Sequence, residues 1–174
     1  AIAKRQGRLH RNFQGYSTQP DCDLIGLGVS AIGKIGAAYS QNAKTLEEYY
    51  AAIDAGHLPV QRGLALSRDD LIRRAVIMSI MCQGAVLREA MEQAWLIDFG
   101  EYFEAELAEL AELQGKGLVR IGSEGFEVTS MGWFFVRAVA MVFDPYLRSA
   151  RKPAGGCGAQ APTLEPGARF SRII

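Results

Sequence analysis

Apolar residues recur at helical spacing through the middle of the chain, between polar residues that favour helix starts and glycines that favour helix ends. Thr45 with Glu48 and Ser67 with Asp70 form capping-box patterns, although the second pair has aspartate where glutamate or glutamine is usual. Asp98 is a candidate cap of a later helix. The pattern predicts helices over residues 45–56, 67–84, 87–96, 98–117 and, after Thr129, 130–143.

Shorter patterns predict β-structure and one buried helix. Residues 23–28, DLIGLG, combine apolar residues with glycine and predict a buried strand that ends in a tight turn. Residues 118–121 and 126–128 flank the turn GSEG and predict a hairpin. The run MGWFFVRAVAMVF, residues 131–143, is too short to span a bilayer and contains Arg137, so it predicts a helix buried on nearly all sides.

Composition divides the chain into three zones. Residues 1–44 are rich in glycine and small residues, and residues 45–148 carry the helical pattern. Residues 149–174 form a tail in which KPAGGCGAQAPTLEPGA, residues 152–168, predicts a flexible segment. The final RFSRII is apolar and basic and is a candidate for docking on the rest of the protein.

Charge and cysteine content exclude several classes of function. The formal net charge is zero, which disfavours a strong electrostatic hold on phosphate or anionic lipid. Cys22, Cys82 and Cys157 are too far apart in sequence to form a known zinc or iron–sulfur motif. The odd cysteine count predicts reduced thiols in a cytoplasm, and the first two cysteines read as small buried apolar residues. The start, AIAKRQGRLHRN, lacks the apolar core of a signal peptide.

Three helices followed by a small hairpin is the element order of a winged-helix-like domain, which raises the hypothesis of DNA binding. The helix before the predicted hairpin would enter the major groove, but five carboxylates on it would be repelled by phosphate. We therefore predict a solvated acidic face rather than a nucleic-acid surface. The five residues are Glu101, Glu104, Glu106, Glu109 and Glu112.

Several specific segments resemble a known enzyme family. The segment GRLHRNFQGYSTQPDCDLIGLGVSAIG, residues 7–33, and RGLALSRDDLIRR, residues 62–74, are similar to the oxygen-independent coproporphyrinogen III oxidases, which are radical S-adenosylmethionine (SAM) enzymes of haem biosynthesis. The resemblance continues through the helical zone to RFSRII and covers roughly nine-tenths of the chain. It implies the C-terminal portion of such an enzyme.

The resemblance implies a mainly α (α+β) fold in two parts. Residues 1–44 would be the edge of an incomplete (β/α) barrel, and residues 45–148 a helical, winged-helix-like C-terminal domain with a small β-hairpin. The family's CxxxCxxC motif, which holds its [4Fe–4S] cluster, is absent from this sequence. We therefore expect an inactive chain on its own, with no catalytic residue or metal ligand in it and a missing N-terminal barrel domain as partner.

The implied reaction is oxidative decarboxylation of coproporphyrinogen III to protoporphyrinogen IX with SAM radicals. Together with the charge, cysteine content and helix lengths, this predicts a cytoplasmic monomer that binds neither nucleic acid nor membrane. An aromatic residue and a glutamine of the family's NFQGY motif, and the isoleucine of GVSAI, contact SAM. They match Phe13, Gln14 and Ile32. Apolar side chains suit the faces of an adenosine, and an amide offers both a donor and an acceptor.

Other polar residues could bind a ligand, but solvent exposure or local ion pairing explains them equally well. His10 could bind a substrate carboxylate, but a basic loop facing solvent explains it as well. Arg68, Arg73 and Arg74 could do the same, yet pairing with the neighbouring Asp69 and Asp70 is also open. His57 follows a helix-ending glycine, and we predict that it is a polar residue at the C-terminal end of that helix with no ligand-binding role.

Two rival functions remain open at this point. One is a non-enzymatic, winged-helix-like interaction module, which the acidic helix and zero net charge permit. The other is a nucleic-acid regulator. The glycine-rich residues 1–44 favour the enzyme portion over the module, because a self-sufficient module has no need of them.

Overall fold

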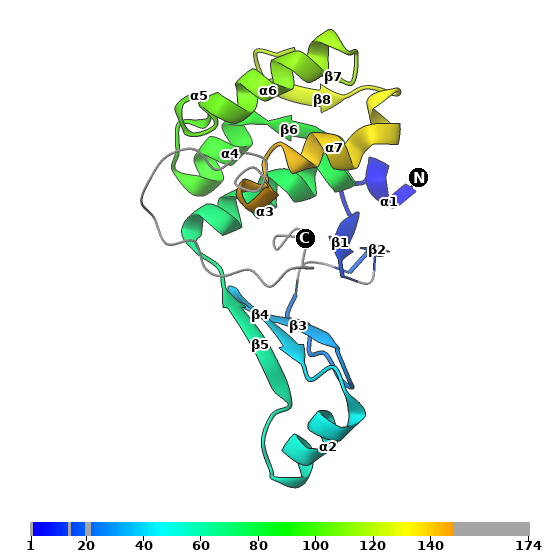
Figure 1. Cartoon of the computed structure of the whole chain (residues 1–174). Helices are drawn as coiled ribbons and strands as arrows, with labels where there is room; N and C mark the ends of the chain where they lie inside the picture. The colour runs from blue at the N-terminus through cyan, green and yellow to red at the C-terminus, as the bar shows by residue number, and fades with distance from the viewer. Residues whose placement is uncertain (1, 14, 20–21, 148–174) are drawn as a thin grey trace. The chain divides into compact units, whose positions relative to one another are not determined.

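The computed structural model describes residues 2–13, 15–19 and 22–147, so predictions for Gln14 and for the tail 149–174 lie outside the described residues. The chain divides into two compact units, Ala1–Ile72 and Arg73–Ile174, each with its own β-structure (Figure 1). The fold is mixed α/β, with more β-structure than the mainly α prediction.

The first unit contains two small antiparallel sheets. One is the pair β1–β2, and the other has the strand order β3-β4-β5, with helix α2 inserted between β4 and β5 (Figure 1). Every strand pair described in this unit is antiparallel, so these pairs do not confirm the predicted edge of a (β/α) barrel. The elements are α1 (Ile2–Arg5), β1 (His10–Asn12), β2 (Gly15–Ser17), β3 (Ile32–Ile35), β4 (Ala38–Asn42), α2 (Leu46–Asp54) and β5 (Val60–Ala65).

The predicted strand at residues 23–28 is wrong. Leu24 alone forms an isolated antiparallel bridge with Lys34, and each of the two residues donates its N–H to the other's carbonyl at 2.7 Å. Beyond this bridge the backbone turns, because Gly28 and Ser30 both have positive φ angles, of 97° and 59°. A chain that turns this soon cannot continue a ladder of hydrogen bonds.

The predicted helix starts at Thr45 and Ser67 are confirmed. Thr45 Oγ1 accepts a hydrogen bond from the Glu48 N–H at 3.3 Å at the start of α2. Helix α3 (Arg68–Cys82) begins with a reciprocal pair, in which Ser67 Oγ accepts from the Asp70 N–H at 3.1 Å and Asp70 Oδ2 accepts from the Ser67 N–H at 2.9 Å. The shorter aspartate therefore completes this capping box.

The second unit places a three-stranded sheet among helices (Figure 1). The predicted hairpin is confirmed as β7–β8, and β6 adds a third strand to give the order β6-β8-β7. Strand β6 lies between the predicted helices 67–84 and 87–96 and overlaps the second only at Leu87. After α3, the elements are β6 (Ala85–Leu87), α4 (Arg88–Trp95), α5 (Phe99–Tyr102), α6 (Glu104–Gly115), β7 (Val119–Gly122), β8 (Gly125–Val128), the 3₁₀ helix η1 (Gly132–Phe135) and α7 (Val136–Met141).

Aromatic rings form the centre of the second unit. Phe103 lies with its ring centroid 5.0 Å from that of Phe99 and 5.3 Å from that of Phe143. Phe126, from β8, stacks on Phe143 at 5.7 Å. All four rings are buried, so they join α5, β8 and the segment after α7 into one core.

The predicted helix 98–117 begins at its Asp98 cap, as expected, but divides at Phe103 into α5 and α6.

The predicted buried helix 130–143 is wrong in two respects. It divides into η1 and α7, and the chain around η1 leaves Met131, Phe134 and Phe135 exposed by 58%, 83% and 51%. The predicted cap at Thr129 is confirmed, because its Oγ1 accepts from the Gly132 N–H at 3.0 Å. A 3₁₀ turn has three residues per turn rather than 3.6, so the apolar side chains here do not gather on the buried side as an α-helix would place them.

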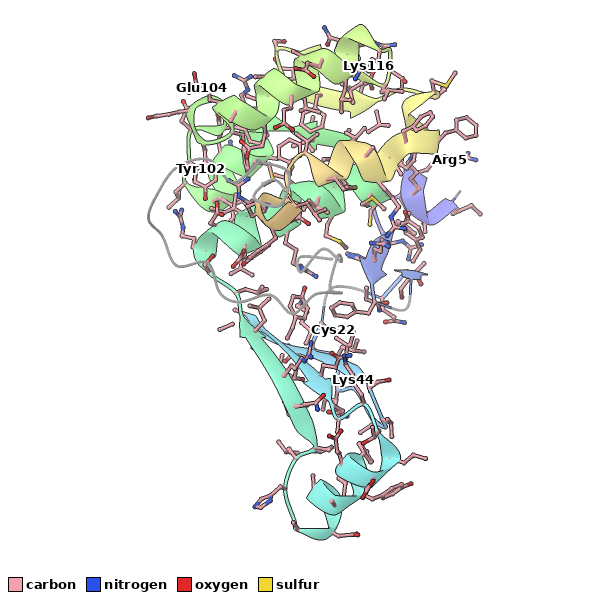
Figure 2. The ribbon with its side chains drawn as sticks, in the orientation of Figure 1. Arg5, Cys22, Lys44, Tyr102, Glu104 and Lys116 are labelled. Atoms are coloured by element: carbon pink, nitrogen blue, oxygen red, sulfur yellow. The ribbon has the colours of Figure 1, made fainter. Side chains whose placement is uncertain are left out.

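Glu106 corrects the prediction of a uniformly solvated acidic face. It is 5% exposed, and its Oε1 accepts a hydrogen bond from Arg73 Nη1 at 2.8 Å. Arg73 also lies with its Cζ 5.4 Å from the centroid of the Phe103 ring. The sequence left open a pairing of Arg73 with the neighbouring aspartates, and the structure adds Glu106 as a partner 33 residues away. Glu104, by contrast, is exposed at the start of α6, where its side chain points away from the helix (Figure 2).

The two described cysteines differ in burial. Cys82, near the end of α3, is buried as predicted, whereas Cys22 is exposed and corrects the prediction of a small buried residue there. Cys22 precedes the isolated bridge at Leu24 and belongs to no strand that could cover it. Within the described ranges, no helix has the length and apolar content needed to cross a bilayer.

The buried Arg73–Glu106 ion pair yields a prediction for stability. Arg73→Met should lower the free energy of unfolding by about 3–5 kcal/mol, because the buried Glu106 would lose the Arg73 cation. The double variant Arg73→Met/Glu106→Leu should regain most of this loss. Urea titration followed by circular dichroism measures both.

The exposed pair Arg120–Glu127 is the matched control, with an Nη1–Oε1 distance of 2.6 Å and side chains that are 75% and 54% exposed. Arg120→Met should cost less than about 1 kcal/mol. Equal losses at Arg73 and Arg120 would show that burial does not govern the Arg73–Glu106 pair.

Candidate functional site

A close approach between two backbone segments shapes the glycine-rich region of the first unit. A Cβ atom on Gly26 would lie 2.8 Å from the carbonyl carbon and oxygen of Ile32. A Cβ atom on Gly33 would lie 2.9 Å from Ser40 Oγ and 3.1 Å from the Leu24 carbonyl oxygen. Distances below 3.0 Å are shorter than real Cβ contacts, and 3.1 Å is tighter than most, so glycine at both positions lets the segment that follows Leu24 lie against β3.

Side chains from β4 and α2 hold this segment in place. Asn42 is 7% exposed, and its Nδ2 donates hydrogen bonds to the carbonyl oxygens of Gly26 at 3.1 Å and of Gly28 at 2.9 Å. The Gly28 N–H donates in turn to Tyr49 Oη at 3.2 Å. The buried amide therefore satisfies two carbonyl groups that the turn removes from any β-ladder.

A pocket of about 300 Å³ lies at this segment. Its lining brings together Phe13, which follows β1, and Ile32, which begins β3. Phe13 is 39% exposed and packs its ring edge-to-face on Tyr39, with 5.2 Å between centroids. The full lining is Phe13, Leu24, Ile25, Gly26, Leu27, Ser30, Ala31 and Ile32.

The pocket contains two of the three predicted SAM contacts. Phe13 and Ile32 are brought together, while Gln14 lies outside the described residues. Ile25 and Leu27, which are 73% and 85% exposed, were not expected in the lining, because the pattern of their run predicts a buried strand. The sequence signal that could have identified Ile25 and Leu27 as lining residues was an apolar run interrupted by glycines, since glycines let backbone N–H and C=O groups approach a ligand.

The other candidate residues do not line this pocket. His10 lies in β1 opposite Ser17 and is half-buried, so it is not part of a solvent-facing loop as expected. His57 is exposed after α2, and Arg68 is exposed at the start of α3. Among the residues with described positions, no three His, Cys, Asp or Glu side chains gather into a group that could hold a metal ion.

The chemistry of the pocket suits a flat, partly apolar ligand. Its side chains are aliphatic or aromatic apart from Ser30, and polar character comes mainly from the backbone of the turn. Its volume is at the lower end of the range for small-molecule sites, which is sufficient for a nucleoside-sized group.

Comparisons with known proteins converge on one family. Residues 66–135 match the family model of the HemN C-terminal domain. A protein of Synechocystis named oxygen-independent coproporphyrinogen III oxidase is 45% identical over 156 residues, which are 87% of this chain and 34% of that protein. A Pseudomonas aeruginosa protein of the same name is 43% identical over 174 residues, which are 100% of this chain and 35% of that protein.

A solved structure agrees with these relatives. Coproporphyrinogen III oxidase (HemN) from Escherichia coli, described as a radical SAM enzyme, matches with a TM-score of 0.81 and 47% identity, over 84% of this chain and 34% of that one. The chain spans about one third of the length of the relatives it matches. It belongs to the family of oxygen-independent coproporphyrinogen III oxidases, of which it represents a C-terminal portion.

Proposed function

We propose that this chain is the C-terminal part of an enzyme that converts coproporphyrinogen III to protoporphyrinogen IX by oxidative decarboxylation of two propionate side chains. Within that enzyme, the pocket at the glycine-rich segment would hold the adenosine part of SAM. The observation that carries this proposal is the meeting of Phe13 and Ile32 in one pocket. The relatives do not favour the alternative of a non-enzymatic interaction module.

The residues of the pocket fit SAM in part. Phe13 and Ile32 offer apolar surfaces for the adenine and ribose, and Gln14, adjacent to Phe13 in sequence, would offer an amide to their polar edges. SAM, when bound, supplies the adenosyl group on which the radical chemistry depends. This chain's contribution is to bind and orient that group.

The described residues do not fit a [4Fe–4S] cluster. The sequence contains no CxxxCxxC motif, and the described part of the chain offers no group of three suitable ligands. The cluster would therefore be held by the part of the enzyme that corresponds to the remaining two thirds of the relatives' length. We propose a cytoplasmic monomer for that complete enzyme, with the barrel domain as this chain's partner.

The second unit supports a winged-helix-like domain. Its elements follow the order helix, strand, helix, helix, strand, strand, as α3, β6, α4, α6, β7 and β8, and the middle strand of the sheet is β8. The domain boundaries at 44/45 and 148/149, and the role of residues 1–44 as a barrel edge, are part of the same proposal. The acidic residues of α6 argue against DNA as the partner of this domain.

Removing the Phe13 ring tests the pocket. Phe13→Ala should weaken SAM binding to the 174-residue chain about tenfold, because the ring would pack on the adenosine. Isothermal titration calorimetry measures the dissociation constant. Phe134→Ala is the matched control, since Phe134 is an exposed phenylalanine of η1 outside the pocket lining. Equal weakening by both variants, or no SAM binding by the wild type, would contradict the assignment.

Asn42 should act on ligand binding by positioning the backbone. Asn42→Ala leaves the carbonyl groups of Gly26 and Gly28 without the amide donor, at a cost of about 1–3 kcal/mol. We expect hydrogen exchange over residues 24–32 to rise at least about tenfold, together with weaker SAM binding. Gln61→Ala, on an exposed position of β5, is the control. Unchanged exchange in Asn42→Ala would show that the amide does not hold the segment.

A further inference from the structure

A row of cross-strand neighbours runs from the pocket to the far edge of the sheet. Ile32 of β3 lies opposite Gln41 of β4, and Gln41 lies opposite Arg62 of β5. Side chains of directly paired residues project from the same face of an antiparallel sheet. Ile32, Gln41 and Arg62 therefore share one face, and with neighbouring strands about 4.8 Å apart, the Ile32 and Arg62 backbones are about 10 Å apart.

Two contacts connect the pocket lining with this face. Tyr39, two residues before Gln41 on β4, projects to the same side, and the Phe13 ring packs on it. Gln41 Nε2 also lies 3.4 Å from the carbonyl oxygen of Ser30, which is part of the pocket lining. Phe13 and Ser30 of the pocket lining thus each contact a residue of the face that carries Arg62.

This face is cationic and contains no carboxylate. Its six positions across the three strands are Ile32, Lys34, Tyr39, Gln41, Arg62 and Leu64. The Arg62 guanidinium is exposed and makes no hydrogen bond or ion pair with any other described residue, unlike those of Arg73 and Arg120, which each pair with a glutamate. A planar guanidinium with this freedom, beside a ligand pocket, suits a carboxylate that binds through two parallel hydrogen bonds.

We propose that Arg62 binds a carboxylate of a reactant held in or beside the pocket, an inference that rests on the proposed function. Two reactants carry such a group. SAM has an amino-acid carboxylate beyond its adenosine, and coproporphyrinogen III has propionates. The spacing from Ile32 to Arg62 allows an adenosine held at Phe13 and Ile32 to present a carboxylate to the guanidinium.

Paired ligands with and without the carboxylate distinguish the two sources. The wild-type chain and Arg62→Gln are titrated with SAM and with 5′-methylthioadenosine, which keeps the adenosine and lacks the amino acid. They are also titrated with coproporphyrin III and with its tetramethyl ester in the same detergent. We expect Arg62→Gln to weaken binding of SAM or of coproporphyrin III by about tenfold or more, and to leave the matching carboxylate-free ligand unchanged.

Two further variants separate the guanidinium's geometry from its charge. Arg62→Lys keeps the charge but loses the planar fork, and should recover only part of the lost affinity. Arg120→Gln removes one charge from an exposed strand position of the second unit and should change none of the four affinities.

The possible failures identify which claim is wrong. If Arg62→Gln changes neither carboxylate ligand, or weakens a ligand and its carboxylate-free counterpart equally, the role of Arg62 is overturned while the pocket stands. If the wild-type chain binds none of the four ligands, the proposed function is contradicted, and the role of Arg62 with it.

Discussion

The close approach of the glycine-rich backbone to β3 is the constraint on which the candidate site depends. A side chain at Gly26 or Gly33 would collide with backbone or Ser40 atoms within 3.1 Å, so larger residues there would push the segment away from the sheet. Once the segment is in contact, Asn42 can satisfy two of its carbonyl groups. The pocket between Phe13 and Ile32 is a consequence of this backbone packing.

The two units are stabilised in different ways. In the second unit, four buried phenylalanines and a buried ion pair form a core of ordinary size and chemistry. Among the described residues of the first unit, the buried apolar side chains are Tyr39, Ala43, Pro59 and Ile72. Backbone hydrogen bonds and close contacts at glycines therefore contribute more to its structure. A ligand that binds such a unit adds a large share of its stability, because binding favours the folded state by mass action.

Local signals in the sequence were sufficient for much of the second unit and for the helix starts. Capping pairs such as Ser67 and Asp70 act within one helical turn, and the hairpin β7–β8 closes over two residues. The burial of Glu106 could also have been inferred, since its spacing from Phe103 and Leu110 places it in the apolar stripe of the helix. Its partner Arg73, 33 residues away, could not.

The hydrophobic periodicity of the sequence did not predict the three-stranded sheet of the first unit. Strand β4, AYSQN, is short and polar, and β5 pairs with it across the whole of α2, so neither strand has a strong local pattern. The resemblance to a family nevertheless singled out Phe13 and Ile32, and the structure places both in the lining of one pocket. What they could not provide was the cross-strand register that places Arg62 on the same face as Ile32.

The most direct test of the central claim is a nuclear Overhauser measurement on the isotope-labelled chain with SAM. The account predicts contacts from the adenine protons to the Ile32 methyl groups and to the Phe13 ring, with no adenine contact to the exposed Phe134. Adenine contacts confined to other residues, in a complex that demonstrably forms, would contradict the assignment of this pocket to the adenosine of SAM.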